Sequence, residues 1–183
     1  MHGDLLGSFA TMSRGFVKEE DQEEAPFIPP RAPLPEGVQN YVTPQGLLLL
    51  HQERDDLEAE RKRTIDAAIS DHDRRHALAV INGKLDLLNE RIATARLIEH
   101  PDEDPEEVRF GMTIMFQQVR KGTKPIERTF TIVGVDEADV KQGKIAFTAP
   151  IAKALIGSRV GDVVEFKLGS EVQQLKILQI NRY

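Results

Sequence analysis

The sequence predicts an α+β protein: an antiparallel coiled-coil hairpin of two helices, followed by a small antiparallel β domain with one short helix. Three observations predict this order. Apolar residues between 43 and 99 repeat at helical spacing, residues 108–183 alternate as strands do, and an acidic, proline-containing stretch separates the two parts. We expect a disordered acidic tail at 1–40, the hairpin at 41–100 and the β domain at 106–183.

Composition limits the classes of function. The formal net charge of −6 argues against independent binding to nucleic acid, which needs a clustered positive field. An acidic protein that works on a nucleic-acid machine is expected to dock on its protein surface instead. The absence of cysteine excludes disulfides, thiolate nucleophiles and cysteine-ligated zinc. Apolar runs such as 47–50 are too short to span a bilayer and no signal peptide is recognisable, so we expect a cytoplasmic protein without membrane contact.

The first 40 residues are predicted to be extended or disordered. An acidic patch at 18–24 is followed by closely spaced prolines between 26 and 35, and prolines disfavour helices and remove ladder donors. A flexible linker is the preferred interpretation, and Met12 reads as a second possible start. A docking arm for a partner is the alternative. It is suggested by apolar residues near the charges: Phe16, Phe27 and Ile28.

The helical part begins at Thr43-Pro44, which supply an N-cap and a first-turn proline. Its second half carries a heptad seam with alternating intervals of three and four residues. The seam consists of Leu78, Ile81, Leu85, Leu88, Ile92 and Ala95. The first half has a weaker apolar face, formed by Leu47, Leu50, Leu57, Ile65 and Ala68.

Residues 70–73 interrupt the apolar pattern with several possible N-caps. We therefore predict two antiparallel helices joined by a tight turn at 70–73, each arm of roughly 25 residues being about 40 Å long. A single continuous helix is the alternative. It would leave the 78–95 stripe without a partner unless the chain dimerises.

In the β part, turn residues, proline and glycine mark where each predicted strand or helix ends. A strand at 129–135 ends in a polar turn, and a second strand at 144–148 stops before a short helix at 150–156. That helix starts with Pro150 and is closed by Gly157, the expected asymmetry of helix ends. The order predicts a short antiparallel sheet wrapped on one small helix.

This segment resembles the C-terminal domain of the Gre transcript-cleavage and elongation factors of bacterial RNA polymerase. The resemblance rests on I-V-G-x-x-E-A-D at 132–139, P-I-A-x-A-L-x-G at 150–157 and V-G-D-V-V at 160–164. Thr43 and Gly46, with the leucines that follow, match the start of the family's hairpin. Further matches lie at the hairpin end, 91–99, and at the junction Val108-Arg109-Phe110-Gly111.

The resemblance implies an FKBP-like C-terminal domain that docks at the rim of the polymerase secondary channel, with the hairpin reaching toward the active site. RNA polymerase is the implied partner of a monomeric chain, with nucleic acid met only inside the elongation complex. The implied docking candidates are Asp139, Thr148, Ala149, Pro150, Ile151 and Ala152. The family usually has serine where this chain has Ala149, and the apolar candidates are better explained as core.

The hairpin tip departs from the family. Members that stimulate cleavage carry Gly-Asp-x-x-Glu-Asn-Ala-Glu-Tyr there, and its acidic pair helps to hold a catalytic Mg²⁺ of the polymerase. This chain lacks the segment, and its hairpin is roughly a dozen residues shorter, which lowers the reach by about 9 Å. Asp71 and Asp73 could stand in for the family's acidic pair. A solvated, N-capped turn is the preferred interpretation, and metal binding by His72 and His76 is the weakest.

Basic residues gather near the same end of the hairpin: Arg61, Lys62, Arg63, Arg74 and Arg75. They could contact RNA or an acidic channel wall, although a solvated helix face is the preferred interpretation. No catalytic triad, phosphate loop or hydride-transfer fingerprint is recognisable, and an isomerase pocket would need more aromatic residues, so we expect no enzymatic activity. We expect no cofactor beyond the polymerase's own Mg²⁺, should the tip reach it.

Three functions remain open at this point. The first is a factor that binds RNA polymerase at the secondary channel and modulates elongation or pausing. The second is a cleavage stimulator that uses Asp71 and Asp73. The third, from a different class, is a scaffold that self-associates through the hairpin seam.

Overall fold

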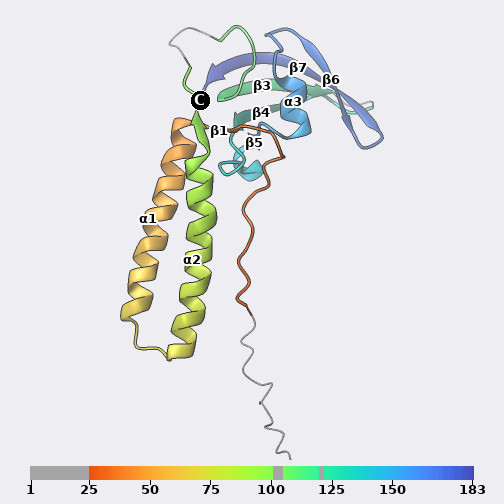
Figure 1. The fold of residues 1–183 in the computed structure, drawn as a ribbon. Helices are drawn as coiled ribbons and strands as arrows, with labels where there is room; N and C mark the ends of the chain where they lie inside the picture. Colours follow the sequence, from red (N-terminus) through yellow and green to blue (C-terminus); the bar gives the residue numbers. More distant parts are fainter. Residues whose placement is uncertain (1–24, 101–104, 120–121) are drawn as a thin grey trace, which may run out of the picture.

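A computed structural model describes residues 25–100, 105–119 and 122–183. A helical hairpin projects from one side of a small β domain, and the C-terminus lies close to the base of the hairpin (Figure 1). Helix α1 spans Pro44–Asp66 and helix α2 spans Asp71–Ala93. Each has 23 residues and is therefore about 35 Å long. The predicted α+β fold with an antiparallel hairpin is confirmed.

The turn between the helices lies at 67–70, a few residues before its predicted position at 70–73. Ser70 is the N-cap of α2, because its side chain accepts a hydrogen bond from the amide of Asp73. Residues 71–73 therefore already belong to the first turn of the helix. Of the polar residues predicted to form the turn, Ser70 ends it, and Asp71, His72 and Asp73 begin α2.

The hairpin has its own apolar core between the two helices. Its buried members in the helices are Leu50, Leu57, Ile81, Leu85 and Leu88, and Val42 joins them at the base of the hairpin. The central seam residues of α2 are thus covered by α1, and the single continuous helix is wrong. The core thins toward the tip, where Ile65 is 53% exposed.

The β domain contains one five-stranded sheet with the order β5-β4-β3-β7-β6. Its strands are β3 (Met112–Val119), β4 (Ile126–Val133), β5 (Lys144–Ala146), β6 (Val163–Leu168) and β7 (Glu171–Arg182). Three of the four pairings are antiparallel, but β4 and β5 run parallel. The sheet is therefore mixed, and the expectation of a wholly antiparallel sheet is wrong at β5. The connection between these two strands contains the 3-10 helix η2 (Val140–Gln142), which lets the chain return to the edge in the same direction.

Helix α3 (Pro150–Leu155) closes the core of the β domain. Ala152 and Leu155 are fully buried among residues of the strands, including Phe116 and Ile132. Gly157 follows the helix with φ of 88°, a left-handed conformation that only glycine adopts without strain. Its amide donates to the carbonyl of Val108, which joins the helix end to the segment before β3.

Two short strands that the sequence did not predict lie at the base of the hairpin. Strand β1 (Asn40–Val42) pairs in parallel with β2 (Ala95–Leu97), so the chain entering α1 lies beside the chain leaving α2. Close packing against the β domain requires Gly134, because a Cβ there would lie 2.8 Å from the carbonyl oxygen of Tyr41.

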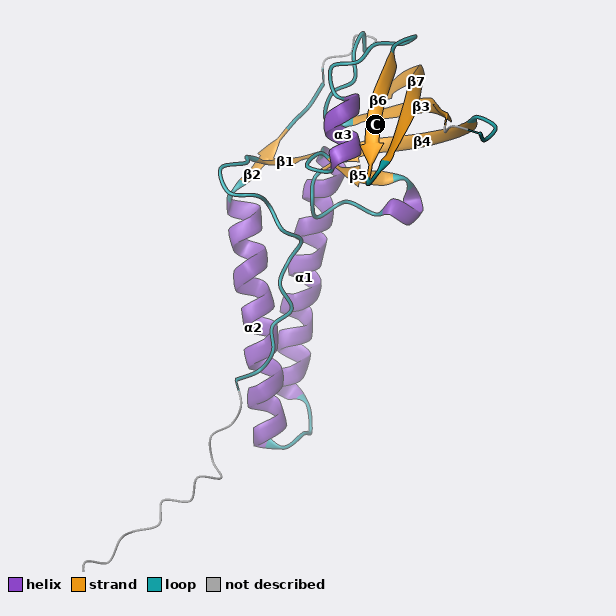
Figure 2. Cartoon of the chain, turned by 90° about the vertical axis from the view of Figure 1, so that its right-hand side faces the viewer, coloured by secondary structure: helices purple, strands orange, loops and turns teal. Residues whose placement is uncertain are grey.

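Residues 25–39, which we call the strap, form no helix or strand; they run along the hairpin and make a turn at 36–37 before β1 (Figure 2). The predicted acidic tail before residue 25 lies outside the described residues. In the described part of the chain, no helix is long and apolar enough to cross a membrane.

Candidate functional site

The base of the hairpin is fastened to the β domain by a buried carboxylate. Glu137 lies in the turn after β4, and its side chain is only 2% exposed. It accepts hydrogen bonds from the hydroxyl of Thr43, from the hydroxyl of Tyr183 at 2.8 Å and from the ammonium of Lys144 at 3.2 Å. A buried charge is tolerated when it is paired and hydrogen-bonded, and Glu137 meets both conditions.

Thr43 performs two tasks with one hydroxyl group. It donates to Glu137 and accepts from the amide of Gly46 at 2.8 Å, so the N-cap of α1 is itself held by the β domain. Gly46 is needed at this point, because a Cβ there would lie 2.6 Å from the Glu137 carboxylate. The Thr-x-x-Gly pattern at the start of the hairpin thus has a direct physical reason.

The other donors to Glu137 also interact with each other. The Lys144 ammonium lies 5.1 Å from the centre of the Tyr183 ring. Burial raises the pKa of Tyr183, and the hydrogen bond with Tyr183 raises the pKa of Lys144. The phenol therefore stays neutral and the amine stays charged, which is the state that donates to Glu137.

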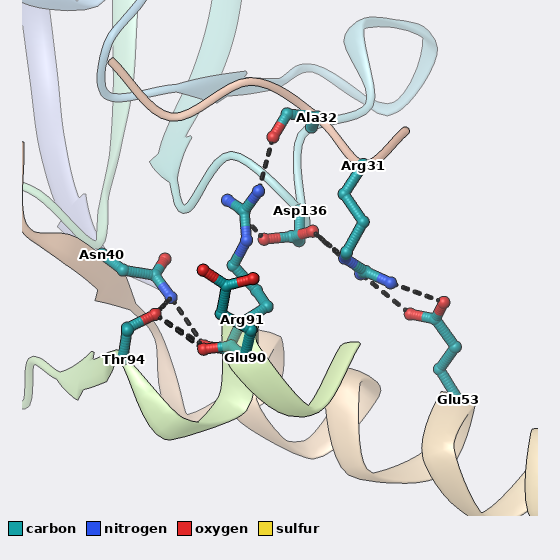
Figure 3. A network of polar contacts seen from close by, with 8 residues as sticks. All are labelled: Arg31, Ala32, Asn40, Glu53, Glu90, Arg91, Thr94 and Asp136. Carbon is teal, nitrogen blue, oxygen red and sulfur yellow. Dashed lines mark hydrogen bonds and ion pairs between the residues drawn. The ribbon is translucent and has the colours of Figure 1, made fainter. Parts of the chain in front are cut away.

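The neighbouring carboxylate, Asp136, binds two guanidinium groups (Figure 3). Arg31 of the strap contacts one of its oxygens at 2.8 Å, and Arg91 of α2 contacts the other at 3.2 Å. Arg31 also binds Glu53 of α1 through two hydrogen bonds of 2.8 and 3.0 Å, which are the main cause of its raised pKa. We call Asp136 and Glu137 together the acidic turn; it holds both hairpin helices.

The end of α2 is closed by polar contacts with β1. The side-chain amide of Asn40 donates to the carbonyl of Arg91 at 2.8 Å and to the hydroxyl of Thr94 at 3.3 Å. Thr94 in turn donates to the carbonyl of Glu90 at 3.0 Å. The final carbonyls of a helix have no partner within the helix, and these contacts satisfy them.

The hairpin tip is a self-paired polar turn. Asp71 binds Arg74 at 2.7 Å, and Arg74 also donates to the carbonyl of Ala67 at 2.9 Å. Asp73 accepts from the hydroxyl of Ser70 at 2.7 Å, and this bond, followed by the contact with His72, lowers its pKa. Both carboxylates stand in the first turn of α2, where the helix dipole stabilises negative charge. Their positions are explained by capping alone.

These residues do not fit a metal site. Within the described ranges, no group of three or more histidine, aspartate or glutamate side chains could hold a metal ion. The two tip carboxylates have local partners, and Arg74 brings a positive charge beside Asp71. His72 contacts Asp73 rather than pairing with His76 around an ion. We derive no metal-dependent step for the tip.

The predicted basic contacts occupy the distal halves of both helices. Arg61, Lys62 and Arg63 are exposed on α1, and Arg75 is exposed on α2. Arg74 is half-buried because it binds across the tip. Contact of these side chains with RNA or a channel wall stays a prediction.

The docking candidates of the β domain differ in exposure. Asp139 caps η2, accepting from the amide of Lys141 at 2.9 Å and from Gln142 at 2.7 Å. Ala149 begins α3 without a side-chain cap, Pro150 is exposed and Thr148 is half-buried. Ile151 packs on the core and Ala152 is fully buried, so Ala152 cannot touch a partner.

Comparison with known proteins decides the family. Residues 102–182 match the family described as transcription elongation factor, GreA/GreB, C-terminal. A transcription elongation factor GreA of Hyphomonas neptunium is 32% identical over 152 residues, covering 76% of this chain and 95% of that protein. The chain belongs to the GreA/GreB family of transcription elongation factors. The resemblance found in the sequence is thereby confirmed.

Further GreA/GreB relatives align over different lengths. GreA of Pelobacter propionicus is 36% identical over 100 residues, which are 55% of this chain and 61% of that protein. The crystal structure of GreA factor homolog 1 of Thermus thermophilus is 19% identical and covers 79% of this chain and 99% of that chain, with a TM-score of 0.35. The assignment to the GreA/GreB family rests on the sequence matches.

Sequence reasoning missed the residues that hold this GreA/GreB-type hairpin at its base. Glu137 was visible as part of the E-A-D pattern, but nothing in the pattern shows that it binds Thr43. Arg31 lies among prolines, 105 residues from Asp136, and no spacing rule connects them. Arg91 lies beside the seam and reads as a solvated helix residue.

Replacing Thr43 tests the fastening of α1. In Thr43→Val we expect a loss of about 2–3 kcal/mol in the free energy of unfolding, because the N-cap is lost and the buried Glu137 loses a donor. Urea unfolding followed by circular dichroism measures the loss. Thr64→Val is the matched control, since the hydroxyl of Thr64 donates to the carbonyl of Glu60 in its own helix. Equal stability losses in the two variants would contradict the assignment.

Replacing Ser70 tests the self-paired tip. In Ser70→Ala the pKa of Asp73 should rise toward its ordinary value, because the hydrogen bond that chiefly lowers it is gone. A lowered carboxyl pKa stabilises the fold above the unfolded-state pKa, and this contribution disappears as the pH falls through the folded-state pKa. NMR titration of the Asp73 carboxyl carbon gives the pKa directly. An unchanged value in Ser70→Ala, equal to that in the remote control Ser170→Ala, would refute the assignment.

Proposed function

We propose that this chain binds bacterial RNA polymerase at its secondary channel and modulates elongation or pausing without stimulating transcript cleavage. The observation that carries the proposal is the projecting hairpin of a chain in the GreA/GreB family (Figures 1 and 2). Two helices of 23 residues form a narrow rod with its own core, and only the tip and outer faces meet the surroundings.

The tip supports occupation of the channel rather than cleavage. Stimulating cleavage through Mg²⁺ would need carboxylate oxygens free to enter the coordination shell. Asp71 and Asp73 are instead engaged with Arg74 and Ser70. In this proposal the hairpin occupies the channel, and the exposed basic side chains Arg61, Lys62 and Arg63 near its tip contact the channel wall.

The start of α3 is the proposed contact with the rim of the channel. Pro150 is exposed there and Thr148 is half-buried, whereas Ile151 and Ala152 stabilise the core beneath them. Ala149 offers no hydroxyl group for a partner hydrogen bond. The contact would therefore depend on shape and on backbone groups more than on side-chain polarity.

The proposed factor works as a cytoplasmic monomer, without a cofactor or enzymatic activity of its own. RNA polymerase is its partner, and nucleic acid is met only within the elongation complex. Self-association through the seam is disfavoured, because Ile81, Leu85 and Leu88 are already covered by α1. A cleavage stimulator remains the alternative that experiment has to separate.

Binding and cleavage should be measured in parallel on stalled bacterial elongation complexes. We expect the chain to bind and to change pausing, with transcript cleavage no faster than that of the polymerase alone. The Asp71→Asn/Asp73→Asn variant should behave like the parent in both assays. The Asp55→Asn/Asp56→Asn variant is the matched control, with an exposed acidic pair on α1 away from the tip.

Two results would contradict the proposal in different ways. Cleavage that the parent stimulates and the tip variant does not would show that the tip reaches the polymerase metal. Absence of binding to the polymerase would remove the proposed partner.

A further inference from the structure

We propose that the strap is a positioning element that fixes the angle between the hairpin and the β domain through Arg31, Arg91 and Asp136. This inference concerns the free chain and does not rest on the polymerase as partner. The strap lies outside the region of the GreA/GreB domain match, which begins at residue 102. It joins three parts of the molecule that are distant in sequence (Figure 3).

Arg31 is the central contact of the strap. One edge of its guanidinium group binds Glu53 of α1 at 2.8 Å, and another edge binds Asp136 of the β domain at 2.8 Å. Rotation of the hairpin against the β domain would change both distances. The side chain of Arg31 thus connects the hairpin directly to the β domain.

Arg91 supplies a second connection from the other helix. It contacts Asp136 at 3.2 Å and donates to the carbonyl of Ala32 in the strap at 2.7 Å. The side chains of Arg31, Arg91 and Asp136 are 17%, 13% and 9% exposed, respectively. Water screens these largely buried pairs with Asp136 less than surface pairs. The Glu53 side chain is 45% exposed, so its pair with Arg31 is held mainly by the two hydrogen bonds to the guanidinium group.

The strap packs against α2 at one point, and most of its residues are exposed. A Cβ at Gly83 would lie 2.1 Å from the Cδ1 of Ile28, so glycine makes room for this side chain in the middle of the helix. Between the strap and the end of α2 lies a cavity of about 890 Å³, which Leu87 and Thr94 help to line. The strap is therefore held by its ion pairs and by the contact of Ile28 with α2. Because no strap residue belongs to the hairpin core, the strap can detach from the hairpin while that core stays closed.

A fixed angle matters because the hairpin is long. With helices of about 35 Å, a rotation of about 10° at the base moves the tip by about 6 Å. Without the strap, the acidic turn would hold α1 only at its start, through Thr43, where the hairpin joins the β domain. Arg31 binds Glu53 more than two helical turns further along α1, where it resists rotation more effectively.

The absence of cysteine makes the angle measurable with spin labels. Exposed Lys62 on α1 and exposed Lys167 on β6 can be replaced by cysteine and labelled, and pulsed dipolar spectroscopy then gives the distribution of distances between them. We expect one narrow distribution in the parent. Arg31→Gln and Asp136→Asn should each broaden it at least twofold.

Arg109→Gln is the control for removing a guanidinium group, because Arg109 pairs with its near neighbour Glu107 at 2.8 Å and this pair lies within one segment of the chain. Its distribution should equal that of the parent. Parent-like distributions in both charge variants would overturn the proposal whatever the polymerase assays show.

Discussion

The buried carboxylate of Glu137 is the contact on which the arrangement of the molecule depends. Three donors from separate parts of the chain converge on it: Thr43, Lys144 and Tyr183. Removing a partner from a buried charge is strongly destabilising, so this cluster constrains every element that contributes to it. The space at Gly46 and the cap of α1 follow from the same contact. Asp136 extends the constraint from α1 to α2.

A rod held at its base is a suitable form for a transcription elongation factor that acts at a distance from its docking surface. The described contacts make the base polar, paired and largely buried, whereas the tip is small and pairs its own charges. The direction of the hairpin is thus set far from the place where it would act. In the proposed function, the β domain determines where the factor binds and the hairpin angle determines where its tip arrives.

Apolar periodicity and the proline and glycine residues at helix ends predicted the elements that depend on residues close in sequence. The heptad seam predicted the hairpin, and Pro150 with Gly157 predicted α3. The turn was misplaced because Ser70 could be read either as turn or as cap. Strands β1 and β2 are too short to show alternation, and a parallel β5 leaves no sign in its own residues. The contacts of the acidic turn join residues far apart in sequence, and no local rule reveals them.

Native-state hydrogen exchange of an Asp136→Ala/Glu137→Ala variant tests most directly whether the acidic turn couples the hairpin to the β domain. Amides that open in one cooperative unit exchange with a common free energy. In the parent, the amides of α1 and α2 should exchange together with those of β3 and β7. In the variant, the helices should exchange earlier while the strands keep their protection. Helices that stay as protected as in the parent would contradict the account.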